Sequence, residues 1–378
     1  MKKQTRTIGA ATVFVAAISV AFNSNCADQL PSVPGTTTTI YATNVFTPFQ
    51  MAMAEDGTMY VGNDTNAAFA RIWRIGKRGT PVELFGDTLM GDPDGVAVDI
   101  AGNLTGTAGA VLVAGSVGIE GIVYSVMPNG SVSNLTALQP AFVNPGPLFV
   151  DPTGRLLFAD TRFGCSGSSY DRLGSWGMVS PPSMIAISAP MPRPYSIASD
   201  SQNRILVSSA CDNDVRLFSL DGALLNASFF KARVGSPLAT AKGGFWGTNV
   251  YSLDPAGQLI CADDQGRVTV KGTQFTNSTF SLLFDNSGNL YVTEYYQSRI
   301  LKITPNPADE LHMTVHVSCL DICWNSKTNK SYQVQYRSDL TTNQWVNLGA
   351  PVSGTGTNTC VTDAVTSEKR FYRVEELP

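Results

Sequence analysis

Six positions of this sequence carry the side chains most suited to binding a small molecule or a metal ion. Each lies eight residues before a Gly or Asn that completes a short turn, and together they are Phe49, Asp94, Gly146, Tyr195, Asn249 and Phe280. Asp94 and Asn249 carry side-chain oxygens, which hard divalent cations such as calcium prefer as ligands. Such a cation takes about six oxygens, so these two side chains form an incomplete set. A divalent cation is the one cofactor that the pattern suggests, and no cofactor is certain.

Two chemistries are open at these positions. A metal held by Asp94 and Asn249 would polarise a carbonyl group and activate a water molecule for hydrolysis. Alternatively, Asp94 caps a loop, Asn249 fills a turn, and the site binds a ligand without catalysis. The surrounding residues mix aromatic and polar side chains, as small-molecule pockets do. The predicted ligand-binding set is Phe49, Asp92, Asp94, Asn144, Tyr195, Trp246, Asn249 and Phe280.

Histidine is scarce in this chain, which limits the possible catalytic sites. His312 and His316 are its only two histidines, and both follow the repeated part of the sequence. The repeats therefore lack a histidine for a Ser–His–Asp triad, a zinc ligand or a general base. Acidic residues that follow the repeated strands have an ordinary structural explanation, since Glu294 lies close enough in sequence to pair with Arg299.

The elements that must position these residues form a repeat. An apolar strand, an Asp-x-x-Gly turn and a second apolar strand recur in Met51–Val61, Val96–Leu104, Leu148–Ala159, Ile197–Ser208, Tyr251–Ala262 and Leu282–Thr293. Asp at the first position of a type I turn accepts hydrogen bonds from the turn backbone, and Gly or Asn at the fourth position tolerates positive φ. The apolar flanks are typical of buried strands. Each copy therefore predicts a buried β-hairpin.

The spacing of the turns indicates how the hairpins are arranged. Successive turns lie 45, 52, 49, 54 and 31 residues apart, and four-stranded propeller blades repeat at about 40–50 residues. The short last gap predicts one brief outer strand in the fifth blade. Thr36–Tyr41 is a spare strand that would complete the sixth blade and close the ring. We predict an all-β chain, with a six-bladed β-propeller over residues 36–305 and a small β-sandwich over 306–378. No helical apolar period separates the strands, which disfavours an α/β fold.

The N-terminus and the cysteines indicate an exported protein. Lys2, Lys3 and Arg6 precede the apolar stretch Ile8–Val20, which is short for a membrane span and typical of a signal peptide. We expect a signal peptide over residues 1–27, a linker over 28–35, and a secreted or periplasmic protein without a membrane span. In such a compartment disulfides are stable. The expected pairs are Cys165 with Cys211, and Cys360 with either Cys319 or Cys323, while Cys261 is expected to be a buried free thiol.

The charge of the chain argues against nucleic acid as a partner. The net charge is −4, only 15% of residues are charged, and the sequence contains no basic run. The partner is expected to be a small molecule, a glycan or a protein.

The C-terminal segment resembles the fibronectin type III-like module of secreted bacterial proteins. The resemblance rests on Ile322-Cys323-Trp324, the run from Ser331 to Tyr336, and the run from Arg370 to Val374. It implies export and no particular chemistry. Trp324, Tyr336 and Trp345 suggest a carbohydrate-stacking strip, but aromatic side chains usually fill the core of such a small domain, and we favour that interpretation.

The repeats resemble the NHL repeat and the gluconolactonase family. Leu290–Glu294 followed by Ser298–Ile300 resembles the first, while Pro93–Asp99 and Asn249 resemble the second. The gluconolactonase family holds a divalent metal with one Glu, two Asn and one Asp, of which only Asp94 and Asn249 have counterparts here. We predict a secreted binding or scaffold module of NHL type. The alternatives are a metal-dependent lactone or sugar-acid ester hydrolase and a carbohydrate-binding protein.

Overall fold

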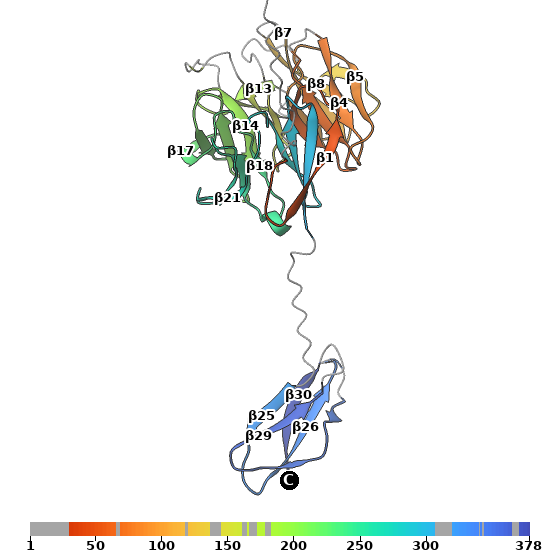
Figure 1. The fold of residues 1–378 in the computed structure, drawn as a ribbon, viewed down its shortest axis with the longest axis vertical. Helices are drawn as coiled ribbons and strands as arrows, with labels where there is room; N and C mark the ends of the chain where they lie inside the picture. Colours follow the sequence, from red (N-terminus) through yellow and green to blue (C-terminus); the bar gives the residue numbers. More distant parts are fainter. Residues whose placement is uncertain are drawn as a thin grey trace, which may run out of the picture. The chain divides into compact units, whose positions relative to one another are not determined.

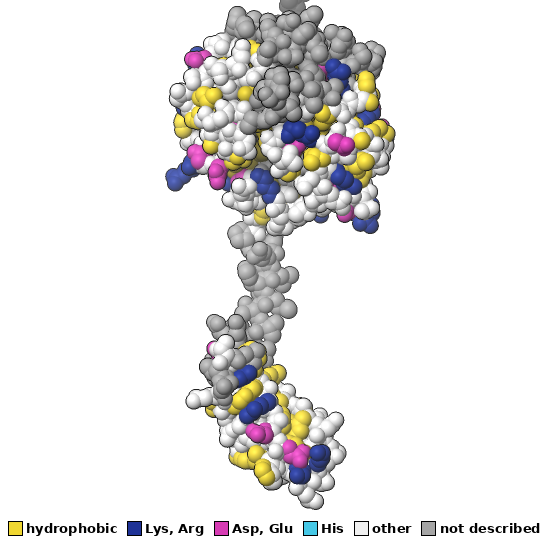
Figure 2. All heavy atoms as spheres, turned by 180° about the vertical axis from the view of Figure 1, so that it is seen from behind, with side chains coloured by type: hydrophobic (Ala, Val, Ile, Leu, Met, Phe, Trp, Pro, Cys, Tyr) yellow, Lys and Arg dark blue, Asp and Glu magenta, His cyan; other side chains and the backbone are white. Residues whose placement is uncertain are grey.

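The computed structural model describes residues 30–65, 69–117, 120–136, 145–160, 165, 172–177, 183–306, 320–339, 341, 344–364 and 370–378. The chain divides into two compact units, Met1–Asp309 and Glu310–Pro378. The predicted signal peptide over residues 1–27, Asn144, His312, His316 and Cys319 lie outside the described residues. Within the described ranges, no helix is long and apolar enough to cross a membrane. On the face of the first unit that Figure 2 shows, basic and acidic side chains are interspersed among uncharged ones.

The first unit is a six-bladed β-propeller, which confirms the predicted fold class (Figure 1). Over its described residues, every blade is an antiparallel sheet of four strands. Blade one contains β2 (Pro48–Met53), β3 (Met59–Asn63), β4 (Phe69–Ile75) and β5 (Val82–Met90), and blade two contains β6 (Val96–Asp99), β7 (Ala110–Val117), β8 (Glu120–Val126) and β9 (Val132–Asn134).

The next two blades follow the same order from the axis outward. Blade three contains β10 (Leu148–Val150), β11 (Leu156–Asp160), β12 (Arg172–Gly177) and β13 (Ser183–Ala186). Blade four contains β14 (Pro194–Ser199), β15 (Ile205–Ser209), β16 (Asp214–Phe218) and β17 (Leu224–Lys231).

Blades five and six complete the ring. Blade five contains β18 (Ala239–Thr240), the short 3-10 helix η1 (Gly244–Trp246), β19 (Val250–Leu253), β20 (Leu259–Ala262) and β21 (Val268–Gly272). Blade six contains β22 (Leu282–Phe284), β23 (Leu290–Glu294), β24 (Arg299–Pro305) and, as its outer strand, β1 (Thr36–Thr43).

The N-terminal strand closes the ring, as the spare strand in the sequence predicts. β1 pairs antiparallel with β24, from Thr36 opposite Pro305 to Thr43 opposite Arg299. Because β1 pairs with β24, the backbone groups at the outer edge of β24 have hydrogen-bond partners. The chain then continues from β1 into blade one, so this pairing connects the first blade to the last.

The Asp turns have the hydrogen bonds expected of them. In blade four, Oδ1 of Asp200 accepts the backbone N–H groups of Gln202 and Arg204, both at 2.9 Å, and Asn203 has a φ of 60°. Arg204 returns a 2.6 Å bond to the Asp200 carboxylate and reaches the carbonyl of Asp264 in blade five at 2.8 Å. The turn therefore fixes the arginine that joins two blades.

The register of blade five differs from the prediction. Its Asp-x-x-Gly turn, from Asp254 to Gly257, connects β19 to β20, which are the second and third strands outward from the axis. The innermost strand is instead the two-residue β18, which pairs with β19. The hairpin is thus displaced by one strand, which lengthens the gap before it to 54 residues and shortens the gap after it to 31. The prediction of a brief outer strand in this blade was wrong, because the brief strand is the inner one.

The hydrophobic core lies between neighbouring blades. One cluster joins Ile72 and Phe85 of blade one to Val111 and Ile122 of blade two. All four side chains are at most 6% exposed. Because each blade buries both faces against its neighbours, the innermost strands are held in a fixed ring.

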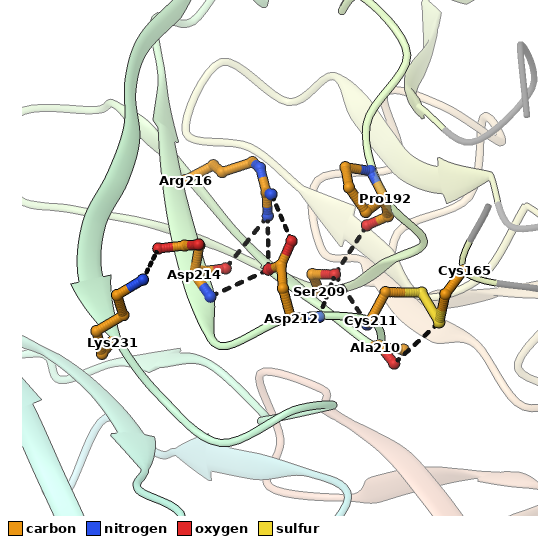
Figure 3. A network of polar contacts seen from close by, with 9 residues as sticks. All are labelled: Cys165, Pro192, Ser209, Ala210, Cys211, Asp212, Asp214, Arg216 and Lys231. Carbon is orange, nitrogen blue, oxygen red and sulfur yellow. Dashed lines mark hydrogen bonds and ion pairs between the residues drawn. A yellow bond between two sulfur atoms is a disulfide. The ribbon is translucent and has the colours of Figure 1, made fainter. Parts of the chain in front are cut away.

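A disulfide links blades three and four (Figure 3). Cys165, after β11, is bonded to Cys211, after β15. Next to it, Ser209 donates to the carbonyl of Pro192 at 2.9 Å and accepts the N–H of Cys211 at 3.0 Å. Covalent and hydrogen bonds thus hold together the loops of two neighbouring blades.

Over its described residues, the second unit contains two small antiparallel sheets. One pairs β25 (Leu320–Asn325) with β29 (Asn358–Asp363), and the other gathers β27 (Val346–Asn347), β28 (Val352–Ser353) and β30 (Phe371–Leu377) around β26 (Ser331–Arg337). Cys323 lies opposite Cys360 and is bonded to it, which answers the choice of partner that the sequence left open.

Trp324, Tyr336 and Trp345 are half-buried and pack against neighbouring side chains. Trp324 packs against Tyr332, with ring centroids 5.7 Å apart. The guanidinium carbons of Arg337 and Arg373 lie 4.4 and 4.6 Å from the centre of the Trp345 ring. These contacts favour packing as the role of the rings over stacking on a carbohydrate.

Candidate binding site in the central channel

A cavity of about 670 Å³ runs along the propeller axis, because residues from the innermost strand of every blade line it. Many of the lining residues are apolar, among them Met51, Val96, Leu148, Ile197, Leu238 and Leu282, which also belong to the core clusters between the blades. Pockets for small molecules typically occupy about 300–1,000 Å³ and are mainly apolar. The channel therefore has the size and the lining of a small-molecule site.

The two ends of the channel differ in their chemistry. At one end lie the turns that follow the innermost strands, and we call it the turn end. Its lining includes Asn103, Gly154 and Lys242. The opposite end, where the innermost strands begin, carries Phe49, Tyr195 and Phe280, and we call it the aromatic end.

Aromatic rings cross the channel at the aromatic end. The ring of Phe49 stacks on Phe280 of blade six, with centroids 5.4 Å apart, and meets the edge of Tyr195 at 5.9 Å. Phe49 belongs to blade one and Tyr195 to blade four, which stand opposite each other in a ring of six. A contact between their side chains therefore spans the axis and narrows this end.

Side chains satisfy backbone groups along the channel wall. Oε1 of Gln50 accepts the N–H groups of Val96 and Leu148, both at 2.9 Å, and its Nε2 donates to the Leu148 carbonyl at 2.6 Å. Oγ of Ser281 accepts the N–H of Met51 at 3.1 Å. The backbone polar groups at the inner edges of β2, β6 and β10 thus have hydrogen-bond partners. The channel wall is therefore less polar than it would be if these strand edges were unpaired.

Asp94 lies near the aromatic end, two residues before β6. Its Oδ1 atom is buried and has no hydrogen-bond partner among the described residues. A Cβ atom on Gly146 would lie 2.9 Å from this oxygen, so the glycine leaves room for the carboxyl group. Burial, and then the nearby charges of Asp92 and Asp64, raise the pKa of Asp94 to about 8. The group is therefore mostly protonated at neutral pH and can donate a hydrogen bond.

The neighbours of Asp94 have structural roles. Oδ1 of Asp92 accepts the N–H of Thr65 at 3.1 Å, which caps the loop that follows β3. Tyr195 has a buried hydroxyl group without a hydrogen-bond partner in the described part of the chain, and burial raises its pKa. Elsewhere, at the end of β23 in blade six, Glu294 pairs with Arg299 at 2.5 Å, as expected from their spacing.

Trp246 and Asn249 lie at the turn end and not beside Asp94. Both belong to the connection between β18 and β19, because the blade-five hairpin is displaced by one strand. Nε1 of Trp246 donates to the Gly288 carbonyl in the blade-six turn at 2.8 Å, and its side chain is only 3% exposed. The assignment of these two residues to the same mouth as Asp94 was wrong, and Asn144 lies outside the described residues.

The available side chains do not fit a divalent metal at the aromatic end. Asp94 and Asn249 lie at opposite ends of the channel and cannot share one ion. Phe49, Gly146 and Phe280, at the matching positions of other blades, have no side-chain oxygen. In the residues that the structure describes, no group of three or more His, Cys, Asp or Glu side chains is placed to hold a metal ion.

Among the lining residues that the sequence reasoning missed, Lys242 and Gln50 have the most distinctive polar contacts. Lys242 follows β18, and its position was hidden by the displaced hairpin of blade five. The unequal spacings of 54 and 31 residues were the available signal. Gln50 follows Phe49 in the innermost strand of blade one. Its hydrogen bonds to blades two and three form only when the blades pack into the ring, so the sequence gives no local signal for them.

Comparison with known proteins places the first unit among β-propellers. A gluconolactonase from Xanthomonas campestris superposes with a TM-score of 0.57 at 15% identity, over 72% of this chain and 94% of that one. The apo-form of the soluble aldose sugar dehydrogenase from Escherichia coli gives a TM-score of 0.54 at 12% identity, over 71% and 99%. No protein-family model matches the sequence. No curated protein matches it either. The likeness defines the fold as a β-propeller, and function must be argued from the channel.

Proposed function

We propose that this protein is a binding module whose central channel takes an apolar small molecule through the turn end. The observation that carries the proposal is the cavity of about 670 Å³ enclosed by the six innermost strands. Burial of apolar surface yields about 25 cal/mol per Å², so a ligand that fills such a wall gains affinity without a metal.

The geometry of the ends supports entry from one side. Phe49, Tyr195 and Phe280 fill the aromatic end with stacked and edge-on rings. The turn end is rimmed by short turns, and its polar side chains include Lys242. A ligand would place its apolar body between the strands and its polar group at the turn end.

The cysteine pairs support a location outside the cytoplasm. Cys165–Cys211 and Cys323–Cys360 are the two disulfides within the described residues. Disulfides persist mainly in oxidising compartments. We propose on this ground a secreted or periplasmic binding module of NHL type, with the second unit as its fibronectin type III-like module.

A gluconolactonase-type hydrolase is the second candidate, and the likeness to the Xanthomonas campestris enzyme favours it. It needs several oxygen ligands around one ion. Asp94 offers one carboxyl group, and Asn249 lies at the other end of the channel. The binding module therefore agrees better with the residues present.

Titration with an uncharged apolar fluorophore, N-phenyl-1-naphthylamine, tests the proposal. Ser199 lines the cavity directly before the blade-four turn, so Ser199→Trp would obstruct the turn end. Ser201→Trp makes the same change on an exposed residue of that turn and serves as the control. We expect saturable binding to the wild type and the control, and at least a tenfold weaker Kd for Ser199→Trp. Absence of binding to the wild type, or equal binding by all three, would overturn the proposal.

A further inference from the structure

We infer that the ligand of the channel is an amphipathic carboxylate, with its apolar chain between the innermost strands and its carboxylate at Lys242. This inference rests on the proposed function, because it names the class of molecule that the same channel would take. It is carried by the charge and the position of one lysine at the turn end.

Lys242 is the only Lys or Arg among the described residues that line the cavity. It follows the innermost strand β18, and its Nζ donates to Oδ1 of Asn286 at 2.8 Å. Asn286 belongs to the blade-six turn, so this bond holds the ammonium group across the boundary between two blades. The partner is a neutral amide, which leaves the positive charge available to an anion.

The carboxylates near this end have their own partners. Oδ2 of Asp99 accepts N–H groups from Leu104 and Thr105 at 2.9 and 2.8 Å. Asp151 pairs with Arg155 at 3.0 Å. Both aspartates are among the residues that line the cavity. Their side-chain oxygens, however, accept hydrogen bonds within the turns that these aspartates begin, and so stabilise those turns.

Asp285 is the acidic group that acts on Lys242 most directly. Its Oδ2 accepts bonds from Asn289 at 2.7 Å and Tyr291 at 3.1 Å, while Lys242 is bonded to the neighbouring Asn286. Partial desolvation lowers the pKa of Lys242, and the charge of Asp285 opposes that effect. Lys242 is nevertheless exposed to solvent, so its ammonium group is accessible to a bound carboxylate, with which it can form a charge-assisted hydrogen bond.

The lining residues of each blade follow one another along a strand, which suits a chain-like molecule. They are residues 49–53 in blade one and 280–284 in blade six, and five such residues span about 13 Å at roughly 3.3 Å per residue. The aromatic rings of Phe49, Tyr195 and Phe280 would meet the far end of the chain. An apolar tail and one anionic head therefore match the two ends of the channel.

Competition for the bound fluorophore by decanoate and by 1-decanol tests the inference. The two probes share a chain length and differ in charge. For the wild type we expect decanoate to compete with a Kd about tenfold lower than that of decanol. In Lys242→Gln the preference should fall to about twofold or less. Lys271→Gln, on the exposed outer strand β21, removes the same charge away from the cavity and should keep the wild-type preference.

The outcomes separate the inference from the proposed function. If the fluorophore binds and decanol competes as well as decanoate, the inference is wrong and the apolar site stands. If Lys242→Gln keeps the tenfold preference while its melting curve matches that of the wild type, the inference is also wrong. If neither the fluorophore nor decanol binds the wild type, the proposed function is wrong, and the inference that rests on it is wrong as well.

Discussion

The rings of Phe49 and Tyr195 meet at 5.9 Å, although their strands belong to opposite blades of the propeller. With Phe280, they turn one end of the axial channel into an aromatic end. The two ends of the channel therefore offer different chemistry to a ligand.

Phe49→Ala should destabilise the propeller and weaken fluorophore binding. Aromatic pairs contribute about 0.5–1.5 kcal/mol each beyond their buried area, and Phe49 takes part in two. We expect the free energy of unfolding to fall by about 2 kcal/mol in urea denaturation. Phe46→Ala, at a side chain that is 58% exposed, is the control. A smaller loss for Phe49→Ala than for the control would contradict the closure of the channel by aromatic rings.

Asp94→Asn should change how stability depends on pH. The pKa of Asp94 rises from 3.8 to about 8 on folding, so between these values the native state holds a proton that the unfolded state has released. The unfolded state then binds fewer protons, and wild-type stability falls as pH rises, by at most about 1.4 kcal/mol per pH unit. Asn mimics the protonated acid and lacks this decline.

The stability difference between Asp94→Asn and the wild type should therefore grow in favour of the variant from pH 4 to pH 8 and then level off. Melting temperatures across this range measure it. Asp264→Asn, at an exposed carboxyl group in the outer turn of blade five, is the matched control and should show a flat difference. A flat difference for Asp94→Asn as well would show that its carboxyl group is ionised throughout.

Divalent cations should leave the melting temperature of the wild type unchanged. A cation that binds only the native state would stabilise it by about 2.7 kcal/mol at a hundred times its Kd. We expect no shift with calcium, zinc or manganese, because Asp94 and Asn249 lie at opposite ends of the channel. A shift that disappears in Asp94→Ala would instead support the metal-dependent hydrolase.

Replacing Cys165 and Cys211 by alanine should lower the unfolding free energy of the propeller by about 2–4 kcal/mol. The bond closes a loop over a sequence separation of 46 residues, and such a link restricts the unfolded chain. Calorimetry measures the change. Replacing Cys323 and Cys360, in the other compact unit, should leave the propeller transition in place. Equal effects of the two pairs would contradict the role assigned to Cys165–Cys211.

The ring could be predicted from sequence because its turn chemistry is local. Asp200 and Asn203 specify a turn through bonds within four residues, and the same pattern recurs along the chain. The spare strand β1 was also predictable, since the last repeat lacks a fourth strand. Local signals of this kind depend little on distant parts of the fold.

The site was harder to predict because it depends on which strand faces the axis. The turn at Asp254 has the same local chemistry as the others, yet it connects the second and third strands of its blade. The assignment of Asn249 to the wrong end and the omission of Lys242 both follow from that one displacement. The aromatic contact between blades one and four likewise exists only in the closed ring.

A crystal structure of the protein with 1-bromonaphthalene tests the central claim most directly, because anomalous scattering locates the bromine. The account predicts bromine density inside the channel, between Met51, Leu148 and Ile197 of three different blades. Density only on the outer surface of the propeller, or none in crystals saturated with the compound, would contradict the claim that the axial channel binds apolar molecules.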